Sequence, residues 1–177
     1  MTPRENGRER SRADRDAAKH KPHRTEERFY KAKRDAHHAC EELRVRIQRS
    51  HIHEAVRKEL LDAVAAAESQ INDVSLTRSH PGAQLRELTK EVGHLQVAET
   101  WLAGADRVLT RLAANGGAGT SGAPSAPRAP RARVEQEVDT VMWHVRAGEW
   151  DGRLTAAVTG LQQAVQDAET HAAHVAS

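Results

Sequence analysis

The sequence predicts an all-α protein: a coiled-coil-like three-helix unit, a C-terminal helical hairpin and a disordered basic N-terminal arm. Apolar residues recur every three or four positions over most of the 177 residues, as on one face of a helix. Residues 24–80 contain no Pro or Gly. Aromatic residues are scarce, so Val, Leu and Ala must build the core, and Ala favours helix. The predicted segments are the arm (1–24), the three-helix unit (25–114), a linker (115–132) and the hairpin (133–177).

The N-terminal arm is basic and has almost no apolar side chains. It includes Pro3, Gly7 and Pro22, and burial there cannot offset the entropy lost on ordering, so we expect disorder or a fraying helix. Residues 1–34 carry twelve Lys/Arg and six Asp/Glu, a net charge of +6. A mobile basic arm suits phosphate backbones, although the interleaved acids dilute its field. Its candidate nucleic-acid contacts are Arg4, Arg8, Arg10, Arg12, Arg15, Lys19, Lys21 and Arg24.

Two stripes of apolar residues follow the arm. Thr25 can N-cap the first helix, Lys33 interrupts its stripe, and Ser50 can N-cap a second helix. The stripes are Phe29, Ala36, Cys40, Leu43 and Ile47, then Ile52, Val56, Leu60, Val64, Ala67 and Ile71. Two antiparallel helices over 25–48 and 51–73 fit this pattern best. One bent helix of roughly 48 residues is the alternative, because a change of phase does not require a break.

A third helix is expected to begin at Pro81, preceded by Ser79 or His80, because proline is tolerated in the first turn of a helix. Its stripe is the most heptad-like in the chain: Leu85, Leu88, Val92, Leu95, Leu102, Val108, Leu109 and Leu112. The Asn-Gly-Gly run at 115–117 is a strong signal for its end.

The linker over 115–132 is rich in Gly, Pro and Ala, and it separates the hairpin from the first three helices. Gly148 is expected to stop the fourth helix, and Asp151 to cap the fifth. The hairpin stripes are Val134, Val138, Val141 and Val145, then Leu154, Val158, Leu161, Val165, Ala168, Ala172 and Val175. Two such helices cannot bury both stripes alone. They must pack on the first three helices, on a second copy or on another protein.

The sequence contains no recognisable catalytic, cofactor or metal motif. His37 and His38 point about 100° apart on a helix and cannot chelate together. Glu91 and His94 have the Glu-x-x-His spacing of di-iron bundles, but they are expected to flank the stripe towards solvent, and the further inward glutamates are lacking. Cys40 lies on a stripe, where it acts as a small apolar residue. We therefore expect no enzyme activity, cofactor, metal or small-molecule substrate.

The expected location is the cytoplasm. A single cysteine cannot form an internal disulfide, the N-terminus shows no secretory signal, and no apolar run approaches the roughly 20 residues that span a bilayer. No membrane association is therefore expected.

The leading functional hypothesis is a non-enzymatic interaction or assembly protein that binds a partner protein or itself through amphipathic helices. Trp101, Trp143 and Trp150 are the candidate partner-binding residues, because tryptophan is favoured at interface centres. Sealing the rim of the helical packing is the alternative role for them. The second hypothesis is a nucleic-acid-binding accessory protein that uses the arm and the basic linker.

Overall fold

The structure is a computed structural model that describes the backbone of residues 5–116 and 128–175, with side chains over 24–114 and 129–174. Within these residues it contains five α-helices and no strand, so the predicted all-α class is confirmed. The helices are α1 (Glu5–Arg49), α2 (Glu54–Asp73), α3 (Pro81–Gly116), α4 (Arg128–Ala147) and α5 (Gly152–Val175).

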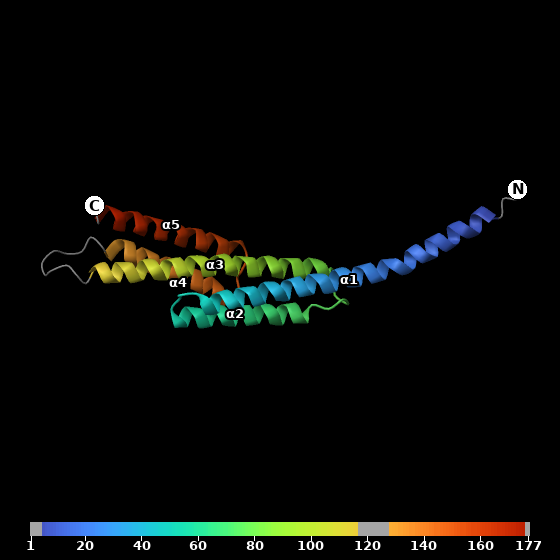
Figure 1. Ribbon diagram of the computed structural model, residues 1–177, viewed down its shortest axis with the longest axis horizontal. Coiled ribbons are helices and arrows are strands. Elements are labelled where there is room, and N and C mark those ends of the chain that lie inside the picture. Colours follow the sequence, from blue (N-terminus) through green and yellow to red (C-terminus); the bar gives the residue numbers. More distant parts are fainter. Residues whose placement is uncertain (1–4, 117–127, 176–177) are drawn as a thin grey trace.

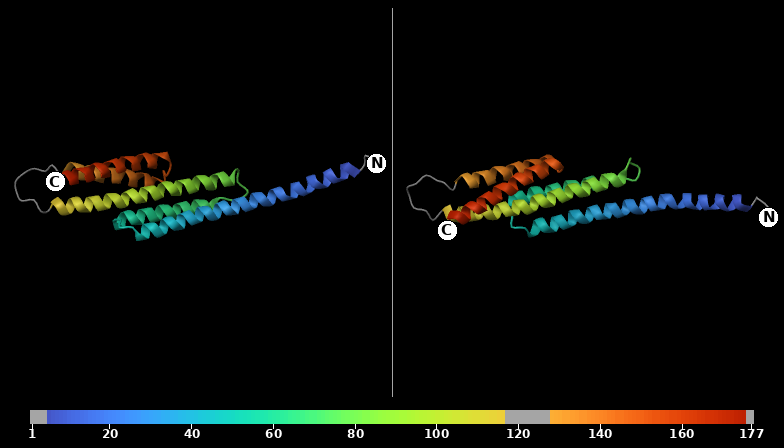
Figure 2. Two further views of the ribbon diagram at one scale, coloured as in Figure 1. Left: turned by 45° about the horizontal axis from the view of Figure 1, so that its top comes forward. Right: turned by 90° about the horizontal axis from the view of Figure 1, so that it is seen from above.

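The five helices are arranged around α3, which contacts each of the other four (Figures 1 and 2). Helices α1 and α2 form an antiparallel pair against α3. Helices α4 and α5 pack on each other and on α3, and α4 also touches α2. The C-terminal hairpin therefore finds its packing partner within the same chain. Of the three partners that the sequence allowed, the structure selects the first three helices.

The break between α1 and α2 confirms two helices rather than one bent helix, but its capping residue differs from the predicted one. Ser50 directly follows the last residue of α1 and closes its last turn, because its backbone N–H donates to the Arg46 carbonyl at 2.9 Å and its hydroxyl oxygen lies 2.8 Å from the same carbonyl. The N-cap of α2 is His53, whose Nδ1 accepts from the Ala55 N–H at 3.3 Å. An imidazole nitrogen here replaces the hydroxyl that capping statistics favour.

Helix α3 begins at Pro81, as predicted. The preceding His80 has a positive φ of 56°, and its carbonyl accepts from the Ala83 N–H at 2.9 Å. Helix α4 begins at Arg128, five residues before the predicted hairpin, with Pro130 in its first turn, where a missing N–H removes no helical bond. The central part of the predicted linker, residues 117–127, lies outside the described residues.

The turn between α4 and α5 follows the sequence prediction. Gly148 has a φ of 71°, the left-handed conformation that ends helices at glycine. Asp151 caps α5 through Oδ1, which accepts from the Arg153 N–H at 2.9 Å.

The core is built from the predicted stripes, and alanines fill the positions where helices approach closely. The largest fully buried side chains are Leu43, Ile47, Leu60, Ile71, Leu85, Leu95, Met142, Leu154 and Leu161. The buried alanines include Ala36, Ala63, Ala67, Ala98, Ala105, Ala164 and Ala168. Supercoiling of the heptad type stays a prediction.

Helix α1 runs past the ends of α2 and α3 and projects alone (Figures 1 and 2). Its backbone is helical from Glu5 and continues through Pro22, so Thr25 lies inside the helix and is not the predicted N-cap. The first buried side chain of α1 is Phe29, within the part whose side chains are described. Disorder or fraying of the arm stays a prediction.

Candidate functional site

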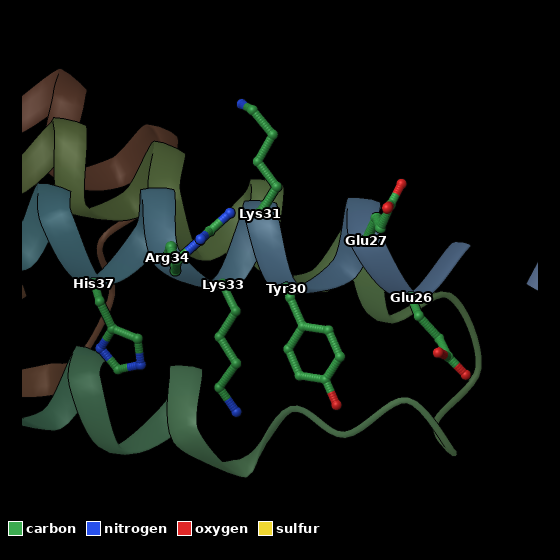
Figure 3. A pocket seen from close by; sticks show the side chains of 7 residues that line it. All are labelled: Glu26, Glu27, Tyr30, Lys31, Lys33, Arg34 and His37. Atoms are coloured by element: carbon green, nitrogen blue, oxygen red, sulfur yellow. The ribbon is translucent and has the colours of Figure 1, made fainter. Parts of the chain in front are cut away.

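The candidate site is the surface where α1 leaves the bundle, which we call the exit surface: Glu26, Tyr30, Lys33, Arg34 and His37. Figure 3 shows Glu26, Tyr30, Lys33 and His37 on one side of α1, facing the segment that follows α2. Together with Glu27 and Lys31, the exit surface lines an open hollow of about 790 Å³.

Lys33 explains why the first stripe is interrupted. Its Nζ donates to the carbonyls of Asn72 (3.0 Å) and Val74 (3.1 Å) at the C-terminal end of α2. A cation at this end complements the helix dipole and satisfies carbonyls that have no partner within the helix. Lys33 therefore fixes the end of α2 to α1, and it also lies 5.9 Å from the centre of the Phe29 ring.

Tyr30 is the exposed aromatic residue of the exit surface, with 56% of its surface accessible. Its ring meets the ring of Phe29 edge to face, with centres 5.3 Å apart. Because Phe29 is buried, this contact supports Tyr30 from one side and leaves the rest of the ring open to solvent.

The basic residues of α1 differ in their partners. Within the part of the chain with described side chains, Arg24, Arg28 and Arg34 are exposed and form no ion pair. Further along α1, Arg44 pairs with Glu68, and Arg46 with Glu99. Guanidinium groups near the exit from the bundle are thus available to an outside anion. Among the predicted nucleic-acid contacts, Arg24 is exposed, Arg4 lies outside the described residues, and the side chains of the other six are not described.

The three predicted partner-binding tryptophans lie in different environments. Trp150 is buried, and its Nε1 donates to the Val145 carbonyl at 3.1 Å. The carbonyl of Trp150 lies 2.7 Å from Nδ1 of His94 on α3, which fixes the α4–α5 turn to the bundle. Trp101 is half-buried against the core. Only Trp143, 55% exposed on α4, offers an accessible ring.

Cys40 and the Glu-x-x-His pair are built into the packing. Cys40 is fully buried, and burial, with Glu68 nearby, raises the pKa of its thiol to about 11. The expectation that Glu91 and His94 face solvent was wrong, because both are half-buried where the α4–α5 turn meets α3. Burial, followed by the charges of Glu87 and Asp151, raises the pKa of Glu91.

No cluster of three potential metal ligands is found among the described residues. Within the same residues, no helix is long and apolar enough to cross a membrane.

Sequence reasoning missed the buried carboxylate of Glu99, which is 3% exposed. Its Oε2 accepts from Arg46 Nη2 at 2.8 Å, and its Oε1 accepts from the Ser50 hydroxyl. Arg46 also donates to the Thr100 hydroxyl at 2.8 Å. The signal was present in the spacing, because position 99 falls between Leu95 and Leu102 at helical intervals on the α3 stripe.

Comparison of the chain with protein-family models, curated proteins and solved structures finds no match in any of the three.

Proposed function

We propose that this chain is a non-enzymatic helical assembly protein that binds a second protein chain, a second copy of itself first among them, through the projecting part of α1. The observation that carries the proposal is the projection itself. About 24 residues of α1 precede Phe29, the first buried residue among the described side chains, and the helix runs there without a neighbouring helix (Figure 1).

A helix in this position gains little from its own chain. Most helical stability in proteins comes from packing of an apolar face, and the arm has almost no apolar side chains to pack within its own chain. Pro22 lies inside the helix and removes one backbone hydrogen bond. A partner surface would supply the contacts that are missing.

Charge supports a second copy as that partner. Residues 1–34 carry a net +6 and the whole chain +2, so residues 35–177 carry +2 minus +6, or −4. The basic segment points away from its own acidic body (Figure 1). The arm of one copy and the body of another are therefore complementary. The apolar stripes of the hairpin do not support association, because most of their described residues are buried within the chain.

Light scattering of the full chain and of a variant lacking residues 1–24 tests the proposal. Among the described side chains every buried core residue lies at or after Phe29, so the truncated chain should retain the bundle. At low salt the full chain should show a mass above 19.5 kDa, whereas the truncated chain, and the full chain at high salt, should be monomeric. A full chain that stays monomeric at about 50 μM and low salt would refute self-assembly.

A second candidate function is a nucleic-acid-binding accessory protein. It is favoured by Arg24, Arg28 and Arg34, which are exposed and form no ion pair with another described side chain. The same pair of proteins tests it. Oligonucleotide affinity should fall steeply with salt and be lost with residues 1–24. Equal binding by the truncated chain would exclude the arm as the binding element.

A further inference from the structure

We propose that the exit surface binds single-stranded nucleic acid, with a base stacked on Tyr30 and the neighbouring phosphates held by Arg34 and the basic segment before it. The inference deepens the second candidate function, on which it rests, because it names the form of the nucleic acid and the place of contact.

The aromatic ring has the properties of a stacking platform. Tyr30 is 56% exposed, yet its edge-to-face contact with buried Phe29 holds it in place. Figure 3 shows its ring extending into the hollow rather than lying along the helix. Bases stack on exposed aromatic rings without regard to sequence, because every base has a π-face. Bases paired within a duplex cannot offer that face to a side chain, which favours a single strand.

The charges around the ring are arranged for an anion. Residues 24–37 contain five Lys/Arg and three Asp/Glu, a net +2, and Arg34 has no ion pair within the described side chains. Lys33 lies beside Tyr30 on the same side of α1 (Figure 3). Its Nζ donates to the carbonyls of Asn72 and Val74. The net +6 of residues 1–34 extends this field along the projecting helix. A positive track with an aromatic ring on it is the pattern by which proteins hold single strands.

The opposing feature is Glu26, which lies on the same side of α1 as Tyr30 (Figure 3). In the sequence of α1 it lies between Tyr30 and the basic segment, so its carboxylate repels a phosphate chain that contacts both. The proposal therefore predicts that Glu26→Gln strengthens single-strand binding. If the strand binds elsewhere on the protein, this substitution should leave the affinity unchanged.

The test measures fluorescence anisotropy of a labelled 20-nucleotide thymidine strand, and of a 20-base-pair duplex, with the full chain at 50 and 200 mM salt. The variants are Tyr30→Ala, Tyr30→Phe and Glu26→Gln. Trp143→Ala is the matched control, because it removes an equally exposed aromatic residue from α4, which does not contact α1 within the described residues. Circular dichroism checks that each variant keeps its helix content.

We expect Tyr30→Ala to weaken single-strand binding by about fivefold or more, and Tyr30→Phe and Trp143→Ala to stay within about twofold of the original chain. Equal binding by Tyr30→Ala, together with loss of binding on removal of residues 1–24, would overturn the inference and leave the second candidate function standing. If the full chain binds neither the single strand nor the duplex, both this inference and the second candidate function are refuted.

Tighter binding to the duplex than to the single strand would also overturn the inference. If the full chain binds no strand but Tyr30→Ala disrupts self-association in light scattering, the exit surface belongs to a protein interface instead.

Discussion

Replacing Arg46 with Met tests how the buried carboxylate of Glu99 fixes the end of α1 to α3. Met keeps most of the aliphatic stem of Arg46 and removes its charge. In the variant, Glu99, only 3% exposed, retains the Ser50 hydroxyl but loses its cationic partner. A hydrogen bond between charged groups contributes about 1.5–3 kcal/mol, and loss of one partner of a fully buried pair costs more. Because the side chain of Arg46 is 43% exposed, water can replace part of the interaction.

We therefore expect Arg46→Met to lower the free energy of unfolding by about 2 kcal/mol. Glu99→Gln should cost less, about 1 kcal/mol, because the freed guanidinium can be hydrated. The double variant should be more stable than the sum of the single losses predicts, by about 1 kcal/mol. Urea unfolding followed by tryptophan fluorescence measures all three values.

The matched control is Arg49→Met. Arg49 also lies in the last turn of α1, so it shares the contribution of the helix dipole, but it is exposed and has no ion pair within the described side chains. Its replacement should change the free energy of unfolding by less than about 0.5 kcal/mol. If Arg46→Met is no more destabilising than Arg49→Met, the buried ion pair does not hold the two helices together and the reasoning fails.

Two further predictions concern glycine and cysteine. Gly93→Ala should stabilise the protein by about 1 kcal/mol, because a Cβ added at this position of α3 would meet nothing within 4 Å. Gly148→Ala should destabilise the protein by about the same amount, because φ at this position is 71°. Thermal unfolding that shifts both variants in the same direction would contradict this. Cys40 should resist disulfide-exchange reagents at pH 8 until urea unfolds the chain, and the free energy of unfolding should fall as pH rises from about 9 to about 11, because the folded thiol holds its proton more tightly than the unfolded one. A Cys40→Ala variant should lack that part of the fall, and rapid labelling of the folded protein would show that the thiol is accessible.

The features predicted correctly from the sequence are those that depend on neighbouring residues. The stripes that end in Ile47 and Ile71 are buried as expected, except that Val56 is half-buried. Helical spacing and burial are local consequences of one periodicity. Pro81 begins α3, Gly148 ends α4 and Asp151 caps α5, because each acts through its own backbone conformation or its nearest N–H groups.

The features that were missed depend on residues far apart in the chain. Lys33 interrupts a stripe in the sequence, and the reason is found only when the end of α2 is placed beside it. Glu99 lies on the α3 stripe, but its partner Arg46 lies 53 positions earlier in the chain. The packing of the hairpin on α3 likewise required knowledge of which helix faces meet. For the candidate site, the arm's charge was visible in the sequence, but the exposure of Tyr30 was not.

Because α1 passes from the bundle into the projection without interruption, its length sets the distance of a bound partner from the bundle, and its helical turn sets the partner's orientation. At 1.5 Å per residue, the 24 residues before Phe29 hold anything bound near the tip roughly 36 Å from the first core contact. Each residue also turns the helix by about 100°. Removing seven residues from the projection would therefore shorten it by roughly 10 Å and nearly preserve the direction in which the bound face points. Removing five residues would turn that face by roughly 140°. Whatever the projection binds, its distance and its orientation relative to the bundle are therefore both set by one count of residues.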